Sequence, residues 1–298
     1  MRRSVIPAAL AMVLVLAGCG SDDGSETEAQ GSVGFSASGE FGDDPEITFP
    51  SDDPSDELEV EVASEGDGDE VQAGDMLVAD YKGQVWDGDV FDSSFDRDAP
   101  TTFGIGVNQV IEGWDEGLVG QNIGSRVLLS VPSEKGYAEG NPSAGIEQGD
   151  TIVFVVDIRD AYATDSTGEA DAEVVEGAAD ELGVTIKGDL GEPVTVEIDD
   201  DADAPSKPET ILLAEGSGDP LEPGETALQF AIGVWDDQDG ASTWDEEQIA
   251  MMTLGDGTTP FDQLLGEPIG SRAAIQVPKT EEAEAMTIIV DIIGQPSR

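Results

Sequence analysis

Histidine is absent from this chain of 298 residues, and cysteine occurs once, at position 19. Without histidine the chain has no Ser-His-Asp triad, no histidine-ligated zinc and no histidine general base. With a single cysteine it has no internal disulfide, so its folded part depends on packing for stability. Redox chemistry by a pair of thiols is excluded for the same reason.

Basic residues are scarce as well, because 12 lysines and arginines stand against 66 aspartates and glutamates, for a net charge of -54. Such a surface repels nucleic acid, which we therefore exclude as a partner, and anionic lipid headgroups. The acidity fits a need for solubility or salt tolerance, and it also fits a cationic partner. Acids cluster at 199–203 and 236–240, yet neither cluster has the spacing of a calcium loop. We expect neither a metal nor a cofactor.

The N-terminus has the pattern of a secretion signal. Arg2 and Arg3 precede an apolar run over 5–16, and the chain continues Leu16-Ala17-Gly18-Cys19. The run is too short to span a bilayer comfortably. The last four residues resemble the lipobox of bacterial lipoproteins, which implies cleavage of a signal peptide 1–18 and lipidation of Cys19. We therefore expect a cell-membrane protein, lipid-anchored at the extracytoplasmic face, with the membrane as a partner.

Residues 19–33 follow as a flexible acidic tether, because they are rich in Gly, Ser, Asp and Glu. Beyond them the sequence repeats itself: the segment that starts at Gly39 recurs from Gly188. Val85-Trp86-Asp87 matches Val234-Trp235-Asp236, and Ile123-Gly124-Ser125-Arg126 matches Ile269-Gly270-Ser271-Arg272. The repeat predicts two modules, 34–162 and 182–298. Between them, 163–181 is small and acidic, which predicts a linker with one short helix that lets the modules move.

Strands are predicted in the first module over 58–63, 76–82, 126–131 and 151–158. Val127, Leu129 and Val131 alternate onto one face of such a strand. A short helix fits 111–119, where Ile111, Trp114 and Leu118 fall on one side. The pattern predicts a helix packed on a sheet, the α+β class.

Three segments of the first module carry a family resemblance: ADYKGQVWDGDVFDSSFDR, VIEGWDEGLVGQNIGSR and VPSEKGYAEGNPSAGI followed by DTIVFVVDI. They resemble FKBP-type peptidyl-prolyl cis-trans isomerases over about residues 71–161. The resemblance implies an α+β fold of two FKBP-like modules, each a curved antiparallel sheet of about five strands wrapped on a short helix. It also implies an apolar pocket between sheet and helix.

The resemblance assigns residues to that pocket, with Trp114 as its floor. The backbone N–H of Ile111 and the hydroxyl of Tyr137 would anchor substrate carbonyls. Asp92 would sit near the twisting carbonyl, and Arg97 would hold Tyr81 and Asp92 in place. The catalytic set is Tyr81, Phe91, Asp92, Ile111, Trp114, Tyr137 and Phe154, and the substrate-binding set is Arg97, Phe103, Val110 and Ile146. Trp114, Phe91, Phe103 and Phe154 equally suit a plain core, and Asp92 equally suits a turn cap.

Such a pocket suits the chemistry, because the X-Pro bond owes its barrier of about 18–20 kcal/mol to amide resonance, and the twisted transition state is less polar. A thousandfold acceleration needs only about 4 kcal/mol of differential binding. The expected function is therefore a peptidyl-prolyl cis-trans isomerase that assists the folding of exported proteins. Its partners would be proline-containing unfolded or exported polypeptides, and the resemblance leaves macrolide ligands open.

Departures from the family pattern occur in both copies. In the first, Thr101 stands where an aromatic residue often lines the pocket, and Pro142 and Gly145 alter the flap after Tyr137. In the second, Phe230 replaces Tyr81 and Phe261 replaces Trp114. The segment from Pro132 to Val156 is also about twice as long as the one from Pro278 to Val290, so the second copy lacks the flap. We expect a degenerate second module without isomerase activity.

Two other functions compete with the enzyme. A non-catalytic FKBP-like chaperone or protein-binding lipoprotein would have a pocket filled by its own side chains. A solute-binding lipoprotein needs two α/β lobes, and the sequence lacks the alternation of strands and helices that they require.

Overall fold

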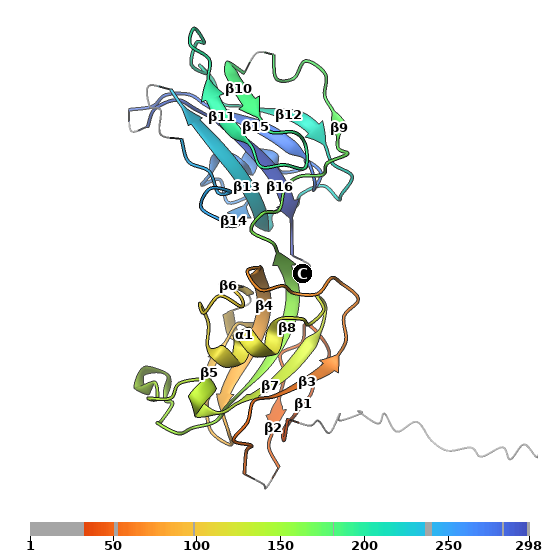
Figure 1. Cartoon of the computed structure of the whole chain (residues 1–298), viewed down its shortest axis with the longest axis vertical. Coiled ribbons are helices and arrows are strands. Elements are labelled where there is room, and N and C mark those ends of the chain that lie inside the picture. The colour runs from red at the N-terminus through yellow and green to blue at the C-terminus, as the bar shows by residue number, and fades with distance from the viewer. Residues whose placement is uncertain are drawn as a thin grey trace, which may run out of the picture.

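The computed structural model describes residues 33–50, 53–97, 99–180, 182–235, 240–281 and 283–296. The predicted signal peptide, Cys19 and the tether up to residue 32 lie outside these residues. The described chain is mostly β structure in antiparallel sheets with one short α-helix, α1. The chain forms two six-stranded sheets among the described residues. Figure 1 shows one sheet beyond the other along the long axis, with β8 running from the first toward the second. Over these ranges no helix is long and apolar enough to cross a membrane.

The first sheet contains the four predicted strands, which the structure confirms, and two more. Its strand order is β3 (Glu59–Ser64), β7 (Arg126–Val131), β8 (Ile152–Tyr162), β4 (Met76–Val85) and β5 (Val90–Ser93), with β6 (Thr101–Gly104) also paired to β4. The sheet therefore has six strands where about five were expected.

Helix α1 (Glu112–Leu118) packs across one face of the first sheet and buries Trp114 and Leu118. Two glycines allow the close approach. A Cβ on Gly113 would lie 2.5 Å from Cγ1 of Val131, and one on Gly117 would lie 2.6 Å from Cδ2 of Leu129. The helix thus lies directly on β7.

A hairpin covers the opposite face of the first sheet. Strands β1 (Ser36–Ala37) and β2 (Ile47–Thr48) pair with each other. Val33 and Phe35 pack there against Leu128 and Val153. Strand β7 is consequently buried along its whole length rather than alternately.

Four strands of the second sheet follow one another in the order that β3, β7, β8 and β4 have in the first. The second sheet runs β14 (Ala250–Leu254), β13 (Gly224–Val234), β16 (Met286–Gly294), β15 (Arg272–Val277), β12 (Glu209–Glu215) and β9 (Glu173–Val174). A hairpin of β10 (Val184–Lys187) and β11 (Thr195–Ile198) lies beside it and packs on its face. The short helix expected here is the 3-10 helix η4 (Pro260–Leu264), which is five residues long and begins after its capping residue Thr259, whereas the first sheet carries the α-helix α1.

The segment expected to be a helix-containing linker differs from that prediction. Described residues 163–180 contain no helix, and β9 within them pairs with β12 as the edge of the second sheet. The Gly168 N–H donates to Asp291 Oδ2 at 2.8 Å, and the Trp244 indole donates to the Ser166 carbonyl at 3.0 Å. Backbone pairing and these bonds attach the segment to the second sheet. Its small, acidic residues did not predict this attachment.

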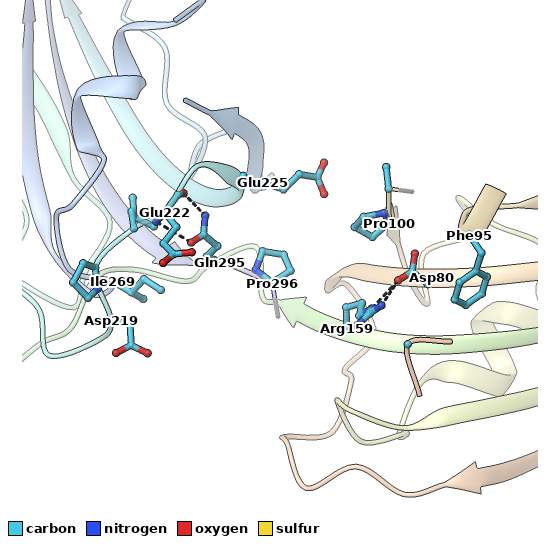
Figure 2. A pocket seen from close by; sticks show the side chains of 15 residues that line it. Asp80, Phe95, Pro100, Arg159, Asp219, Glu222, Glu225, Ile269, Gln295 and Pro296 are labelled. Atoms are coloured by element: carbon cyan, nitrogen blue, oxygen red, sulfur yellow. Dashed lines mark hydrogen bonds and ion pairs between the residues drawn. The ribbon is translucent and has the colours of Figure 1, made fainter. Parts of the chain in front are cut away.

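The two sheets meet where β8 ends. Tyr162 packs there with Val78 of the first sheet and with Ala227 and Ile249 of the second. Beside this contact lies a groove of about 910 Å³ with walls from both sheets (Figure 2).

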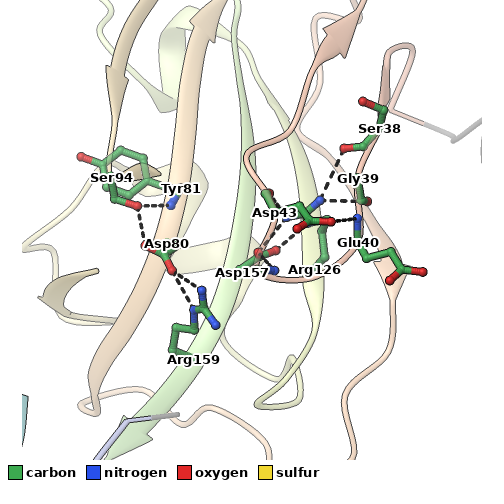
Figure 3. Close-up of polar contacts among 11 residues, drawn as sticks. Ser38, Gly39, Glu40, Asp43, Asp80, Tyr81, Ser94, Arg126, Asp157 and Arg159 are labelled. Atoms are coloured by element: carbon green, nitrogen blue, oxygen red, sulfur yellow. Dashed lines mark hydrogen bonds and ion pairs between the residues drawn. The ribbon is translucent and has the colours of Figure 1, made fainter. Parts of the chain in front are cut away.

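Each sheet holds a buried arginine–aspartate pair at the same place. Arg126 Nε and Asp157 Oδ1 lie 2.6 Å apart, and both residues are almost fully buried (Figure 3). Arg126 also donates to the carbonyls of Gly39 and Asp43, at 3.0 and 2.7 Å. A charge is stable in such a site only when paired and hydrogen-bonded. These bonds fasten the segment before β2 to the sheet.

In the second sheet, Arg272 Nε and Asp291 Oδ1 are again 2.6 Å apart. Arg272 donates to the carbonyls of Asp189 and Glu192 at 3.1 and 2.9 Å. The two sheets therefore share a buried ion pair as well as the order of four strands.

Candidate functional site

Five aromatic rings gather between α1 and the first sheet. The ring of Trp114 lies edge-on to those of Tyr81, Phe103 and Phe154, with centroids 5.3, 5.0 and 5.3 Å away. Phe91 packs on Phe154 at 5.7 Å. Edge-to-face pairs at these spacings are mutually stabilising, so the rings hold one another in fixed orientations.

Space for these rings depends on Gly83 in β4. A Cβ at Gly83 would lie 2.7 Å from Cζ of Phe91 and 2.8 Å from Cε1 of Phe154. Both contacts are closer than real Cβ atoms allow. Glycine at this register position is therefore what lets two phenyl rings form the wall of the site.

A polar trio lies at the rim of the site. The Tyr81 hydroxyl donates a short hydrogen bond to Asp92 Oδ2, and Arg97 donates to Asp92 Oδ1 at 2.5 Å. Arg97 also reaches the Tyr81 hydroxyl at 3.3 Å and the Thr101 hydroxyl at 3.4 Å. Its guanidinium carbon lies 5.8 Å from the centroid of the Tyr81 ring. Arg97 thus touches both partners that the sequence assigned to it.

The pKa values of Tyr81 and Asp92 in this trio differ from their ordinary values. Burial, together with the hydrogen bond to Asp92, raises the pKa of Tyr81 to about 12. Burial would raise the pKa of Asp92, but the hydrogen bonds from Tyr81 and Arg97 outweigh it and hold that pKa below its ordinary value. At neutral pH the phenol is therefore neutral and the carboxylate is charged.

A second polar chain fixes the backbone beneath the trio (Figure 3). Ser94 Oγ accepts from the Tyr81 N–H at 2.9 Å and donates to Asp80 Oδ1 at 2.8 Å. Asp80 is held in turn by Arg159, whose Nη2 lies 2.6 Å from its Oδ2. This chain ties the turn after β5 to β4, and so it sets the separation of Asp92 from Tyr81.

The loop before α1 supplies a free donor. Asp115 accepts from the N–H groups of Gly106 and Asn108, at 2.6 and 2.8 Å, which fixes the loop. Ile111 caps the helix in an extended conformation, and no partner for its N–H is found among the described residues. Gln109 also lines the cavity, and the sequence reading missed it because a single glutamine in a loop has no distinguishing pattern.

The flap after β7 carries Tyr137. It contains the 3-10 helices η2 (Ser133–Lys135) and η3 (Pro142–Ala144). Lys135 Nζ lies 2.6 Å from Glu112 Oε1 and 2.7 Å from Glu116 Oε2, both on α1. The flap is thus attached at its base to the helix that carries Trp114, and Tyr137 lines the cavity.

Ile146 departs from the expectation that it lines the pocket. It is only 1% exposed and belongs to the hydrophobic core, and it is not part of the cavity wall. Its backbone pairs with Asn141 across the flap, which turns the side chain inward. The structure therefore places the Ile146 side chain in the core and not in the cavity wall.

The cavity formed by these elements has a volume of about 440 Å³. It gathers all of the predicted catalytic residues and two of the predicted substrate-binding residues. Its lining is Tyr81, Phe91, Asp92, Phe103, Gln109, Val110, Ile111, Trp114, Tyr137 and Phe154. The indole Nε1 of Trp114 is buried and has no hydrogen-bond partner in the described structure. An open apolar cavity with unpartnered donors suits a ligand that carries carbonyl groups.

Comparison with known proteins agrees with this geometry. A family model described as FKBP-type peptidyl-prolyl cis-trans isomerase matches residues 68–159, which lie within the first sheet and its connections. The FK506-binding protein of Streptomyces anulatus is 37% identical over 116 residues, which cover 38% of this chain and 94% of that protein. The chain belongs to the FKBP family.

Further FKBP relatives match a similar share of the chain. The FK506-binding protein of Neisseria meningitidis serogroup B is 39% identical over 105 residues, 35% of this chain and 96% of that protein. The peptidyl-prolyl cis-trans isomerase FKBP15-2 of Arabidopsis thaliana is 42% identical over 100 residues, 33% of this chain and 61% of that protein. A solved structure, the crystal structure of AtFKBP13, is 33% identical, covers 34% of this chain and 90% of its own, and has a TM-score of 0.32.

Proposed function

We propose that the cavity beside Trp114 catalyses the cis–trans isomerisation of X-Pro bonds in polypeptides. The observation that carries the proposal is an open, aromatic cavity of about 440 Å³ in an FKBP family member. It is not filled by the chain's own side chains, which argues against a silent binding module. The FKBP relatives named above as FK506-binding make a macrolide a further ligand for the same cavity.

Catalysis here needs no nucleophile and no proton transfer. The proline ring would sit over Trp114, among apolar rings that exclude water and favour the less polar, twisted amide. The N–H of Ile111 and the hydroxyl of Tyr137 would bind carbonyls on either side of the rotating bond. Arg97 and Tyr81 fix Asp92 at the rim, so its charge would be presented to the twisting carbonyl without reorganisation.

The test is a proline-limited refolding assay with the full chain. Trp114→Leu should lower kcat/KM at least tenfold, because it removes the surface on which the ring rests; a tenfold loss corresponds to about 1.4 kcal/mol. The matched control is Phe261→Leu in η4, at the position that answers Trp114, which should stay within about twofold of the unmodified chain. An unmodified chain that does not accelerate refolding would favour the chaperone instead.

We also propose that the protein acts on exported chains at the outer face of the cell membrane, anchored through lipid on Cys19. The support is the sequence Leu16-Ala17-Gly18-Cys19 after an apolar run, followed by residues 19–33 as a tether. Cell fractionation tests it: Cys19→Ser should move the protein from the membrane fraction to the soluble fraction. Retention of the variant in the membrane fraction would sink the idea.

We further propose that the second sheet and its hairpin form a degenerate FKBP-like module. The order of four of its strands and its buried Arg272–Asp291 pair match those of the first, which supports a shared origin. It has η4 in place of α1, and only a short connection between β15 and β16 in place of the flap. Its role would be structural or in holding clients.

A further inference from the structure

The groove between the two sheets is about twice the volume of the isomerase cavity, at about 910 Å³. Phe95 and Pro100 contribute its wall from the first sheet's connections, and Leu221, Ile269 and Pro296 contribute the wall from the second. Figure 2 shows these two walls facing each other across an open space. The groove thus offers apolar surface on both sides, and it exists only in the complete chain.

Among the described residues, Arg159 is the one cation that lines the groove, and it is already engaged. Arg159 pairs with Asp80 at 2.6 Å, and its guanidinium carbon lies 5.0 Å from the centroid of the Phe41 ring. An anionic ligand would therefore have to break an existing pair. The groove is not an anion site.

The acidic side chains of the groove have fewer partners than Arg159 among the described residues. Asp219, Glu222 and Glu225 line it, and none of them forms a salt bridge with the described residues. Oε2 of Glu225 is buried without a hydrogen-bond partner in this part of the chain, and Figure 2 shows its carboxylate directed toward Pro100. Burial raises the pKa of Glu225. A cation placed beside this carboxylate would offset its desolvation.

Three prolines in the walls, Pro100, Pro220 and Pro296, offer carbonyls but no N–H groups. Pairing with a ligand by strand addition would need alternating donors and acceptors, so recognition here falls to side chains and to ligand donors. A lysine or arginine supplies several donors and no acceptor. The prolines of the walls and the acidic side chains therefore both favour a ligand with lysine or arginine side chains.

We propose that this groove binds an extended polypeptide segment in which basic side chains alternate with apolar ones. The occupant is a client chain rather than a small molecule, because the groove adjoins the isomerase site. The 3-10 helix η1 (Phe95–Arg97) forms part of both: Phe95 lines the groove, while Arg97 holds Asp92 at the cavity rim. A client held in the groove would keep its neighbouring prolines close to the cavity, at a raised effective concentration. This last consequence rests on the proposed isomerase function, whereas binding in the groove does not.

The experiment measures fluorescence anisotropy of a labelled, proline-free peptide of alternating lysine and leucine with the full chain. Two matched peptides carry glutamate for lysine or serine for leucine. Glu225→Gln removes the charge of this partly buried side chain while keeping its shape. Asp203→Asn is the matched control, because it removes one charge from an exposed loop after β11, outside the groove lining.

The lysine–leucine peptide should bind, and Glu225→Gln should weaken its Kd by about five- to tenfold, as expected for losing one charge-assisted contact. Asp203→Asn should change Kd less than about twofold. Both matched peptides should bind more weakly. The proposal is overturned by no binding, by equal binding of the glutamate peptide, or by equal effects of Glu225→Gln and Asp203→Asn.

A short proline tetrapeptide, assayed with the same variants, separates the two proposals. Glu225→Gln should leave its isomerisation rate unchanged, because Glu225 is not part of the cavity wall. If the unmodified chain fails to isomerise the tetrapeptide, the proposed function is wrong, and the anisotropy titration still decides the groove.

Discussion

The two sheets of this protein share a framework and differ in what they place upon it. In the first sheet Tyr81 pairs with Val156, and in the second Phe230 pairs with Val290, so their registers correspond. At the positions of Phe103 and Phe154 the second sheet has Met252 and Ile288. Strand order and buried ion pairs therefore specify the fold, while a few facing side chains specify the cavity.

The sharpest single difference is at the position of Gly83, which the second sheet fills with Ile232. Gly83 pairs with Phe154 in the first sheet, and Ile232 pairs with Ile288 in the second. Ile232 packs in the hydrophobic core of its sheet. An aliphatic side chain thus stands where the first sheet keeps room for two phenyl rings.

The polar rim differs in the same way. Tyr81 N–H donates to Ser94 Oγ, and Phe230 N–H donates to Thr243 Oγ1, which aligns the turns that follow. Counting from these hydroxyls, Asp92 corresponds to Ala241 and Arg97 to Glu246. The contacts that fix the turn are kept, and the trio that this turn carries in the first sheet is lost.

The largest expected effect tests what the sheets share. Asp157→Ala and Asp291→Ala each leave a buried arginine unpaired, so each should destabilise its own sheet by about 3–5 kcal/mol. Hydrogen exchange in urea, followed peptide by peptide, measures the stability of each sheet within the same chain. A cost below about 1 kcal/mol for either variant would show that the buried pair is not a shared support.

An intermediate effect is expected from building the second sheet's residue into the first. Gly83→Ile should lower kcat/KM at least tenfold, because the new side chain collides with Phe91 and Phe154, and overpacking should cost about 1–3 kcal/mol of stability. The reciprocal change, Ile232→Gly, should destabilise the chain and leave the isomerisation rate alone. Full activity in the Gly83→Ile variant would mean that the phenyl wall is dispensable.

The smallest effect is expected from Tyr81→Phe, which gives the first sheet the residue type that the second sheet has at Phe230. At neutral pH the lost hydroxyl should cost about 0.5–1.5 kcal/mol. Because the folded pKa of Tyr81 is about 12, above its ordinary value of 10.0, its contribution is complete below about pH 10 and is lost as pH rises toward 12.

For Asp92, whose folded pKa is lowered, the contribution is present above about pH 4 and is lost as pH falls below it. Urea unfolding across pH should therefore give a flat difference between the unmodified chain and Tyr81→Phe from about pH 5 to 9, followed by a decline on the alkaline side. If this difference in unfolding free energy changed between pH 6 and 8, the assigned protonation states would be contradicted.

Sequence reasoning worked where a pattern repeats. Alternation located β3, β4, β7 and β8, and the spacing of Ile111, Trp114 and Leu118 located α1. The family motifs named most of the cavity wall, since aromatic residues in a fixed order are a specific signal. Sequence reasoning worked least where contacts between residues distant in sequence decide the local structure.

Three such places stand out. The strand β9 forms because β12 offers it an unpaired edge, which composition does not reveal. Ile146 turns inward because its backbone pairs with Asn141. The groove of Glu225 and Pro100 exists only once both sheets are in place.

The most direct test of the difference between the sheets uses the four tryptophans of the chain as reporters. Trp114 lies at the floor of the cavity, Trp86 packs beside the first hairpin, and Trp235 and Trp244 belong to the core of the second sheet. Titration of the full chain with a short proline peptide, followed through the four indole N–H resonances, should shift the signal of Trp114 and leave those of Trp235 and Trp244 in place. Shifts at Trp235 or Trp244 with Trp114 unmoved would place substrate binding in the second sheet and contradict the account.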